Sequence, residues 1–332
     1  MEIENLLSKL RVPEWEIQDP TKVMEYIRCP RKYFYGYVLG WRPTMPNNHL
    51  VFGTAVHKAM EHILLNGYSV NEVLRAHEKF LHYYREHFPE DTDEMFFPKT
   101  PDNFLVVLTA YTRKYERDLD SFKVLYTEIA GTISLRDDLS LAFRMDSILE
   151  NLKGLRSSLE HKTGSSSWNW EMQWDLSIQV GTYTHVLNCL FDLESVEGVR
   201  MNGLIFGKAK KGWEQLKTGQ SLTVNPPFDF IRYPAFKSKT QMQTWLYTVT
   251  YYLDMIKFEF EQLLHCRFDD PVMFAFPMRH VACTDFGGCP WHDFCISFQN
   301  PLQRSEEPPL GYEVSHWNPL KEEATTRFEL KG

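Results

Sequence analysis

Apolar and polar residues alternate along the middle of the chain, where β-branched and aromatic residues are also frequent. The stretch 122–131 is rich in both types, and the stretches 139–148 and 155–164 continue the alternation. Because successive side chains of a strand point to opposite faces, this period of two predicts three strands. Residues 151–154 include an asparagine and a glycine, which are typical of a turn. We therefore expect 139–148 and 155–164 to form one hairpin.

On either side of these strands the apolar residues follow helical spacing. Between 52 and 67 they recur every three or four positions, and Gly67 is suited to end the helix. The same reasoning predicts helices over most of 68–122, over 171–190 and over 239–267, and strands over 201–207 and, at a sheet edge, 228–233. Strands mixed with helices favour a single α/β domain with helical insertions. The tail after residue 300 has proline and charge without a repeat, and we expect it to wrap the surface.

Three charged residues of the predicted hairpin can meet on one face. Glu160 and Lys162 share a face of their strand, whereas Leu159 and His161 take the other. If Asp146 faces the same way across the hairpin, two carboxylates and an ammonium converge. Such a set can hold a hard divalent cation and orient a water, which is the chemistry of metal-assisted phosphodiester hydrolysis. The same spacing also occurs on solvated hairpins, so the pattern alone leaves both readings open.

Composition narrows the class of protein. With 43% hydrophobic and 14% aromatic residues, the 332-residue chain can bury a substantial core. The net charge of −8 and the pI near 5.9 do not indicate a nucleic-acid binder, although a local basic groove can coexist with an acidic surface. The first residues lack a signal-peptide pattern, and no apolar run approaches the length of a membrane span. We expect a cytoplasmic protein that does not bind membranes.

The six cysteines are not expected to form a disulfide framework in a reducing compartment. Cys189 and Cys266 lie in apolar, helix-like contexts, which indicates packing. The other four are a distant upstream cysteine and a C-x5-C-x5-C cluster: Cys29, Cys283, Cys289 and Cys295. Four thiolates suit a [4Fe–4S] cluster and also a structural zinc, and their spacing alone favours neither.

A basic and aromatic segment surrounds Cys29. Arg31 and Lys32, together with the neighbouring tyrosines, could contact a nucleic-acid strand by charge and stacking. An amphipathic helix that buries its rings would give the same pattern. Upstream of the hairpin, His57 and Glu61 share a face of the predicted 52–67 helix.

Five motifs occur in the order found in one nuclease family. They are Gly53-x-x-x-His57, Met145-Asp146, Glu160-His161-Lys162-Thr163, Gln179-x-x-x-Tyr183, and the split cysteines. On these motifs the chain resembles the PD-(D/E)XK nuclease superfamily, and within it the RecB-type and AddB-type exonuclease domains that carry an iron–sulfur cluster. That group includes the CRISPR-adaptation nucleases and phage-encoded homologues. The chain departs from the pattern at Met145, where a proline is common, and in the five-residue gap between its first two clustered cysteines.

The resemblance implies a restriction-endonuclease-like α/β core, with a mixed central sheet flanked by helices, helical insertions, and an iron–sulfur cluster that joins the two ends of the chain. It implies one nuclease domain over 1–332, whose parts are the iron–sulfur region (21–40 and 277–300), a helical insertion (68–122), the catalytic core (123–210) and a C-terminal tail (301–332).

The resemblance also assigns roles to residues. The implied ligands of Mg²⁺ or Mn²⁺ are His57, Asp146, Glu160 and the main-chain carbonyl of His161. The implied catalytic residues are Asp146, Glu160, Lys162, Gln179 and Tyr183. Lys162 would position the attacking water, and Gln179 and Tyr183 would steady the site and contact the DNA backbone, with Arg31 and Lys32 as further DNA contacts. The implied cluster is [4Fe–4S] on Cys29, Cys283, Cys289 and Cys295, with structural Zn²⁺ as the alternative.

These assignments predict a metal-dependent DNA exonuclease that acts on single strands or DNA ends in recombination, repair or replication, with a protein partner from one of those processes. Two alternatives use the same sequence features. A structure-specific endonuclease would share every catalytic residue, and a catalytically silent iron–sulfur scaffold subunit would keep only DNA binding.

Overall fold

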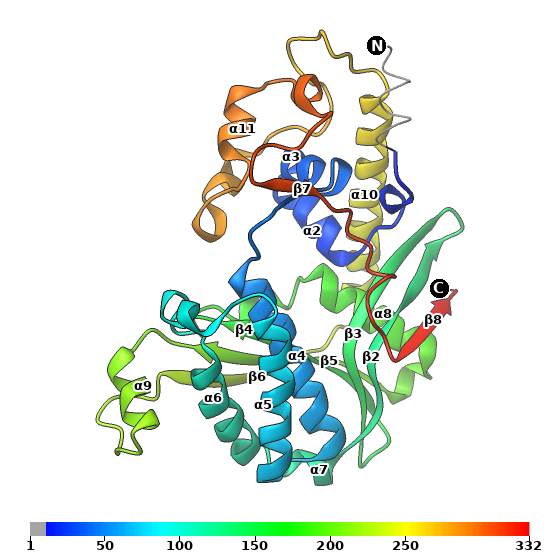
Figure 1. Cartoon of the computed structure of the whole chain (residues 1–332). Coiled ribbons are helices and arrows are strands. Elements are labelled where there is room, and N and C mark those ends of the chain that lie inside the picture. The colour runs from blue at the N-terminus through cyan, green and yellow to red at the C-terminus, as the bar shows by residue number, and fades with distance from the viewer. Residues whose placement is uncertain (1–10, 332) are drawn as a thin grey trace.

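The computed structural model describes residues 11–331, and its centre is a six-stranded mixed sheet (Figure 1). In spatial order the strands are β6 (Phe228–Ala235), β5 (Val196–Phe206), β4 (Arg156–Gly164), β3 (Leu139–Asn151), β2 (Phe122–Arg136) and β8 (Thr326–Leu330). The β4–β5 and β2–β8 pairs are parallel and the other three are antiparallel. Helices flank this sheet, so the predicted α/β class with a mixed central sheet is confirmed.

The hairpin of β3 and β4 turns where the sequence predicts. The Asn151 side chain accepts hydrogen bonds from the backbone N–H groups of Lys153 and Leu155, at 2.8 and 3.1 Å. Gly154 has a φ of +75°, a conformation that glycine adopts without steric cost. The turn therefore fixes the register from which the two strands leave.

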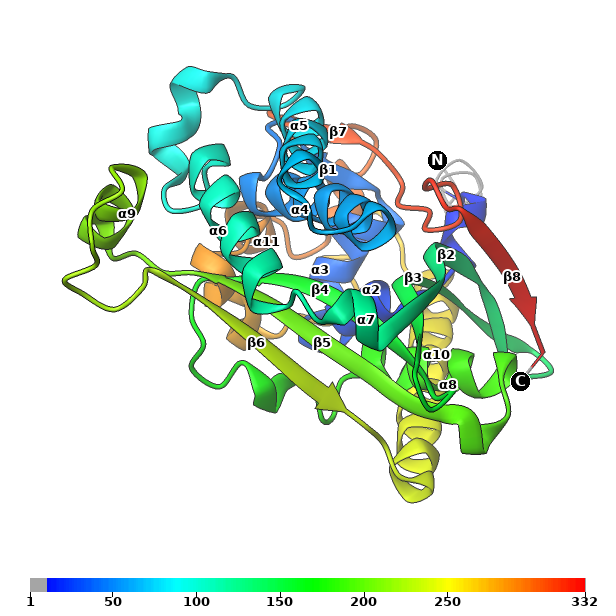
Figure 2. The ribbon, with the colours of Figure 1, turned by 90° about the horizontal axis from the view of Figure 1, so that it is seen from below.

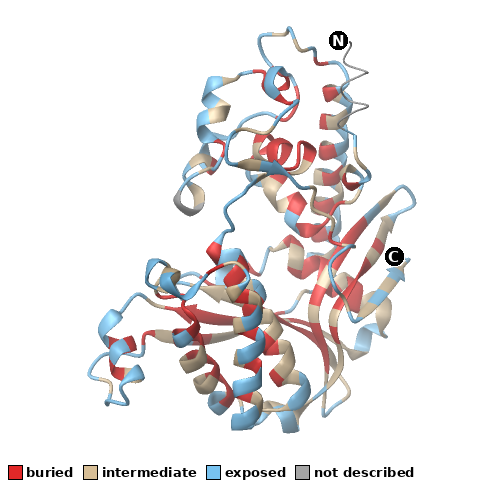
Figure 3. Ribbon diagram, viewed as in Figure 1, coloured by how far each residue is buried: buried red, intermediate tan, exposed pale blue. Residues whose placement is uncertain are grey.

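Two helical layers cover the two faces of the sheet (Figure 2). One layer contains α4 (Asn48–Asn66), α5 (Val70–Arg85), α6 (Pro101–Lys114) and α7 (Asp118–Ser121). The other contains α8 (Ile178–Leu190), which begins seven residues later than the predicted 171–190 helix, and α10 (Lys239–Leu263). Side chains from each layer form a separate buried core against the sheet, whose central strands β3, β4 and β5 are mostly buried (Figure 3). No described helix is long and apolar enough to cross a membrane.

Segments from both ends of the chain make a second lobe above the sheet (Figure 1). They include α2 (Pro20–Arg28), α3 (Pro30–Tyr33), α11 (His292–Ser297), and the antiparallel pair β1 (Trp41–Pro43) and β7 (Tyr312–Val314). A short helix, α9 (Lys210–Lys217), lies at the far end of the sheet.

The C-terminal tail contributes strands to both sheets instead of only wrapping the surface as expected. β8 extends the central sheet beyond β2, with Ile129 opposite Thr326 and Gly131 opposite Phe328. A Cβ at Gly131 would lie 2.0 Å from the Phe328 carbonyl oxygen, so only glycine permits this approach. β8 has five residues, too few for its alternation to stand out in the sequence.

Glu14, which lies just before α2, joins the N-terminal part of the chain to the C-terminal tail. It accepts a 2.7 Å hydrogen bond from the Lys321 ammonium, which is the main reason that the pKa of Glu14 falls from 4.5 to about 2. Since the folded protein binds this proton less readily than the unfolded chain, the contact stabilises fully above pH 4.5 and is lost as the pH falls toward 2. We expect Glu14→Gln to lower the melting temperature at neutral pH by an amount that shrinks on acidification.

Thermal melts of both proteins across this range measure the difference. Glu16→Gln is the matched control, because its exposed carboxylate pairs, among the described residues, with the exposed Arg11 alone. A Glu14→Gln difference that stays constant with pH would contradict the assignment.

Candidate metal site and catalytic pocket

The hairpin of β3 and β4 opens just before the predicted site. β3 and β4 are paired only from Ile148–Ser158 to Glu150–Arg156. Beyond Ile148 the strands separate, and side-chain carboxylates take the place of ladder hydrogen bonds. Asp146 Oδ2 accepts from the His161 N–H at 2.7 Å, and Glu160 Oε1 accepts from the Asp146 N–H at 3.3 Å. The backbone of the opposite strand therefore holds each carboxylate in a fixed orientation before a ligand binds.

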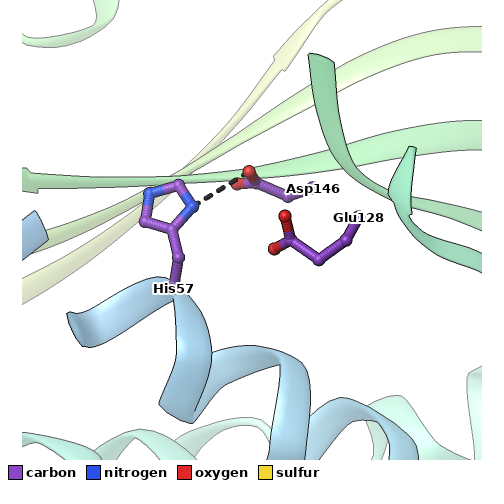
Figure 4. Close-up of side chains that lie close together, drawn as sticks. All are labelled: His57, Glu128 and Asp146. Atoms are coloured by element: carbon purple, nitrogen blue, oxygen red, sulfur yellow. Dashed lines mark hydrogen bonds and ion pairs between the residues drawn. The ribbon is translucent and has the colours of Figure 1, made fainter. Parts of the chain in front are cut away.

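His57 reaches this opening from α4. Its Nδ1 lies 2.9 Å from Asp146 Oδ1 (Figure 4). Burial opposes a charged imidazole, but the Asp146 charge and hydrogen bond outweigh it and raise the pKa of His57. The sequence could place His57 on a helix face, whereas its contact with a strand 89 residues away depends on how α4 packs on the sheet.

Glu128 joins these two residues, and the sequence analysis missed it. Ligand atoms of His57, Glu128 and Asp146 all lie within 4.8 Å of one another, so these three residues could bind a metal (Figure 4). Glu128 lies on β2, where its register places it opposite Asp146. The only sequence signal was a single acid within an apolar, β-branched stretch, and exposed strand acids give the same signal.

The backbone of Glu128 is unusual for a strand residue. Its φ is +44°, in the left-handed region, which costs a non-glycine residue roughly 1–2 kcal/mol. Such conformations persist only where the surroundings hold them in place. Arg144 donates a 2.8 Å hydrogen bond to Glu128 Oε2 and so holds the carboxylate as well.

The two hairpin carboxylates differ in their affinity for protons. Burial, together with the Asp146 charge, raises the pKa of Glu160 well above its usual value. Burial also acts on Asp146, but the charge and the hydrogen bond of His57, together with the charge of Lys162, outweigh it and lower the pKa of Asp146. The Ser158 hydroxyl donates a short hydrogen bond to Glu160. Buried acids in this arrangement repel one another, and a divalent cation would relieve that repulsion.

Lys162, Gln179 and Tyr183 complete the group around the opening. Lys162 lines the same pocket as His57, Asp146 and Glu160, and its charge favours the charged forms of the two carboxyl groups. Gln179 donates to the Tyr183 hydroxyl at 2.8 Å, and that hydroxyl donates a short hydrogen bond to the Arg144 backbone carbonyl. α8 is therefore joined to β3 two residues before Asp146.

All these side chains line one open pocket with a volume of about 710 Å³. The residues of the site that face it are His57, Glu128, Asp146, Glu160, Lys162, Gln179 and Tyr183. Part of the opposite wall comes from the C-terminal tail, which contributes Trp317, Pro319 and residues 322–325. Carboxylates, an imidazole and an ammonium in one water-accessible pocket can bind a divalent cation and an anionic substrate together.

The backbone and the side chain of His161 have different surroundings. Its N–H holds Asp146, while its ring points to the other face of β4, where Nδ1 lies 2.8 Å from Asn202 Nδ2. Burial lowers the pKa of His161 to about 3, so the ring is neutral. That the main-chain carbonyl of His161 binds the metal stays a prediction.

Arg31 and Lys32 are engaged within the second lobe. Arg31 is buried and donates to the Phe276 carbonyl at 2.9 Å, and Lys32 pairs with Glu25 at 2.8 Å. Their part in DNA binding stays a prediction, which these internal contacts disfavour.

The four cysteines of the predicted cluster gather in the same lobe. The Cys29 sulfur accepts a 3.4 Å hydrogen bond from the Arg279 N–H, and the Cys289 N–H donates to the Cys283 carbonyl at 2.9 Å. Burial first, and then the nearby Cys29 thiol, raises the pKa of both Cys289 and Cys295. Residues 250 positions apart in the sequence are therefore neighbours here. Among the residues that the structure describes, the cysteines do not form a three-ligand group within 4.8 Å.

Comparison with known proteins bears on the family. A model of the PD-(D/E)XK nuclease superfamily matches residues 20–295 of this chain. No curated protein matches it. Five solved chains do, including the "Crystal structure of SSO0001", at 12% sequence identity and a TM-score of 0.29 over 75% of this chain and 81% of that chain.

Proposed function

Because this chain belongs to the PD-(D/E)XK nuclease superfamily, which implies a phosphodiester hydrolase that uses a divalent metal, we propose that it is a DNA exonuclease acting on single strands or DNA ends. The observation that carries this proposal is the convergence of His57, Glu128 and Asp146 in a pocket that also holds Lys162. Recombination, repair and replication are the processes that supply such DNA ends.

The donor set suits Mg²⁺ or Mn²⁺. Carboxylate oxygens are the ligands that hard cations prefer, and an imidazole in the set makes Mn²⁺ competitive. Asp146 and Glu160 would be ligands as the family pattern implies, and Glu128 would add a third carboxylate. When bound, the cation would activate a water and stabilise the charge that develops on the phosphate.

The remaining roles belong to side chains of this chain. Lys162 is placed to orient a water and to offset negative charge on a phosphate in the pocket. The Gln179–Tyr183 pair, anchored on β3, holds the strand that carries Asp146 and presents polar groups to a DNA backbone. Arg144 and Lys58 also line the pocket and can attract phosphates despite the net charge of the chain.

Cleavage of labelled DNA tests the function. We expect the protein to degrade end-labelled linear single-stranded DNA in Mn²⁺ and not in EDTA, and to spare covalently closed single-stranded circles. Cutting of circles as fast as linear strands would replace the exonuclease by an endonuclease. Binding of DNA without any cleavage, in any divalent metal, would favour the scaffold alternative.

We also propose a [4Fe–4S] cluster on Cys29, Cys283, Cys289 and Cys295. Support comes from the gathering of these cysteines in one lobe. Four thiolates are the usual ligands of such a cluster, and a structural zinc is the alternative. The cluster would join the two ends of the chain, closing a loop of more than 250 residues.

A further inference from the structure

The C-terminal tail meets the candidate metal site at Glu128. Residues 317–330, which we call the C-terminal segment, lie outside the 20–295 range that matches the family. This segment nevertheless forms part of the pocket wall and ends in β8, next to β2 (Figure 1). The arrangement raises the question of what the segment does for the site.

Thr325 holds the backbone of β2 where it is least regular. Its N–H donates to the Glu128 carbonyl at 2.9 Å, and its hydroxyl donates to the carbonyls of Thr127 and, at 3.3 Å, Glu128. The regular β2–β8 pairing begins only at Ile129, opposite Thr326. The hydrogen bonds of Thr325 therefore hold the left-handed residue Glu128 itself, and they lie outside the regular β2–β8 ladder.

The segment also reaches the carboxylate end of Glu128 through Arg144. Arg144 donates to Glu128 at 2.8 Å, and its other terminal nitrogen lies 3.5 Å from a carboxylate oxygen of Glu322. Glu322 in turn receives a hydrogen bond from Arg327 at its backbone carbonyl. Both the backbone and the carboxylate of Glu128 are thus constrained by the same short segment.

The segment is anchored on both sides of this contact. Upstream, Trp317 donates to Asp19 at 2.6 Å and Lys321 pairs with Glu14 at 2.7 Å. Downstream, β8 packs against Gly131, where only glycine allows the approach. Anchors at both ends let Thr325 constrain Glu128 instead of moving with it.

We propose that the C-terminal segment completes the metal site, with Thr325 as the positioning residue that holds Glu128 in the conformation that directs its carboxylate toward His57 and Asp146. The inference rests on the proposed divalent-metal site and adds a residue outside the family match to it. A strand that only covered a sheet edge would pair along the ladder and would not need to bond the one left-handed residue of β2. Partners that orient a ligand commonly contribute ten- to hundredfold to metal affinity.

Mn²⁺ binding to the full-length protein, without DNA, tests the proposal. Room-temperature EPR of free Mn²⁺ gives the dissociation constant. We expect Thr325→Pro, which removes the N–H donor, to weaken Mn²⁺ binding by roughly tenfold, and Thr325→Val by a smaller factor. Thr326→Val is the matched control, because its side chain makes no hydrogen bond among the described residues, and its affinity should equal that of the wild type.

A double-mutant cycle with Glu128→Gln separates a specific effect of Thr325 on Glu128 from a general destabilisation of the fold. If Thr325 acts through Glu128, Thr325→Pro should have little further effect once Glu128 is Gln. Equal losses in both backgrounds, or an unchanged affinity in Thr325→Pro with an unchanged melting temperature, would overturn the proposal. Because the assay needs no DNA, a wild-type protein that binds Mn²⁺ but cleaves nothing would refute the proposed function and leave this inference intact.

Discussion

We expect Asp146→Ala to abolish DNA cleavage, lowering the rate by on the order of a thousandfold or more, because a group that helps to stabilise the developing charge is lost. Asp146 is the residue on which the site converges. It contacts the His57 imidazole at 2.9 Å and the His161 N–H at 2.7 Å, and it lies in the three-ligand group with Glu128. Its removal would take away a proposed metal ligand and, at the same time, the contacts that hold the His57 ring and the His161 backbone. Single-turnover digestion of end-labelled single strands in Mn²⁺ measures the loss.

The control for this variant is Asp138→Ala. Asp138 is exposed at the tip of the β2–β3 hairpin, where it pairs with Arg136. Asp138→Ala should leave the rate unchanged. Asp146→Ala should remain folded and keep most of its DNA affinity, because most phosphate attraction comes from cations that remain. Wild-type cleavage by Asp146→Ala, in a preparation free of contaminating nuclease, would remove the residue from the site.

We expect Cys29→Ala to abolish the proposed iron–sulfur cluster and to lower solubility and stability together. Metal sites of this kind couple ligation to folding, and Cys29 would be the ligand that joins the N-terminal part of the second lobe to its three C-terminal cysteines. Anaerobically purified wild-type protein should be brown and contain about four irons per chain. Absorbance near the visible thiolate-to-iron bands and iron analysis, on protein never exposed to oxygen, measure the loss.

Cys189→Ala provides the matched control. Cys189 lies on α8 and packs against the core of the sheet, so its substitution should keep colour and iron. Stoichiometric zinc with no iron in the wild type would replace the cluster by a structural zinc without affecting the hairpin site. Iron retained in full by Cys29→Ala would exclude Cys29 as a ligand.

Local pattern determined the strands of the hairpin and the α/β class. The period of two over 139–148 and 155–164 predicts which face of the strand each side chain takes. This alternation follows from the local backbone conformation alone. The turn at 151–154 was equally local, because Asn151 bonds its own nearby backbone. The start of α8 was misplaced because 171–177 has helical spacing but forms a short 3-10 turn before Ser177 caps the helix.

The composition of the pocket was decided by tertiary structure. Glu128 became a candidate ligand because β2 pairs with β3 in a register that sets it opposite Asp146, and because its backbone is left-handed. Nothing in a ten-residue window separates that glutamate from a solvated one. Thr325, which contacts Glu128, lies 197 residues further along the chain. It comes just before β8, whose five residues are too few for the sequence to predict the strand. The sequence by itself thus determined which residues lie on each strand face, whereas strand order and register decided which of them meet, since long-range pairing depends on the packing of the whole sheet.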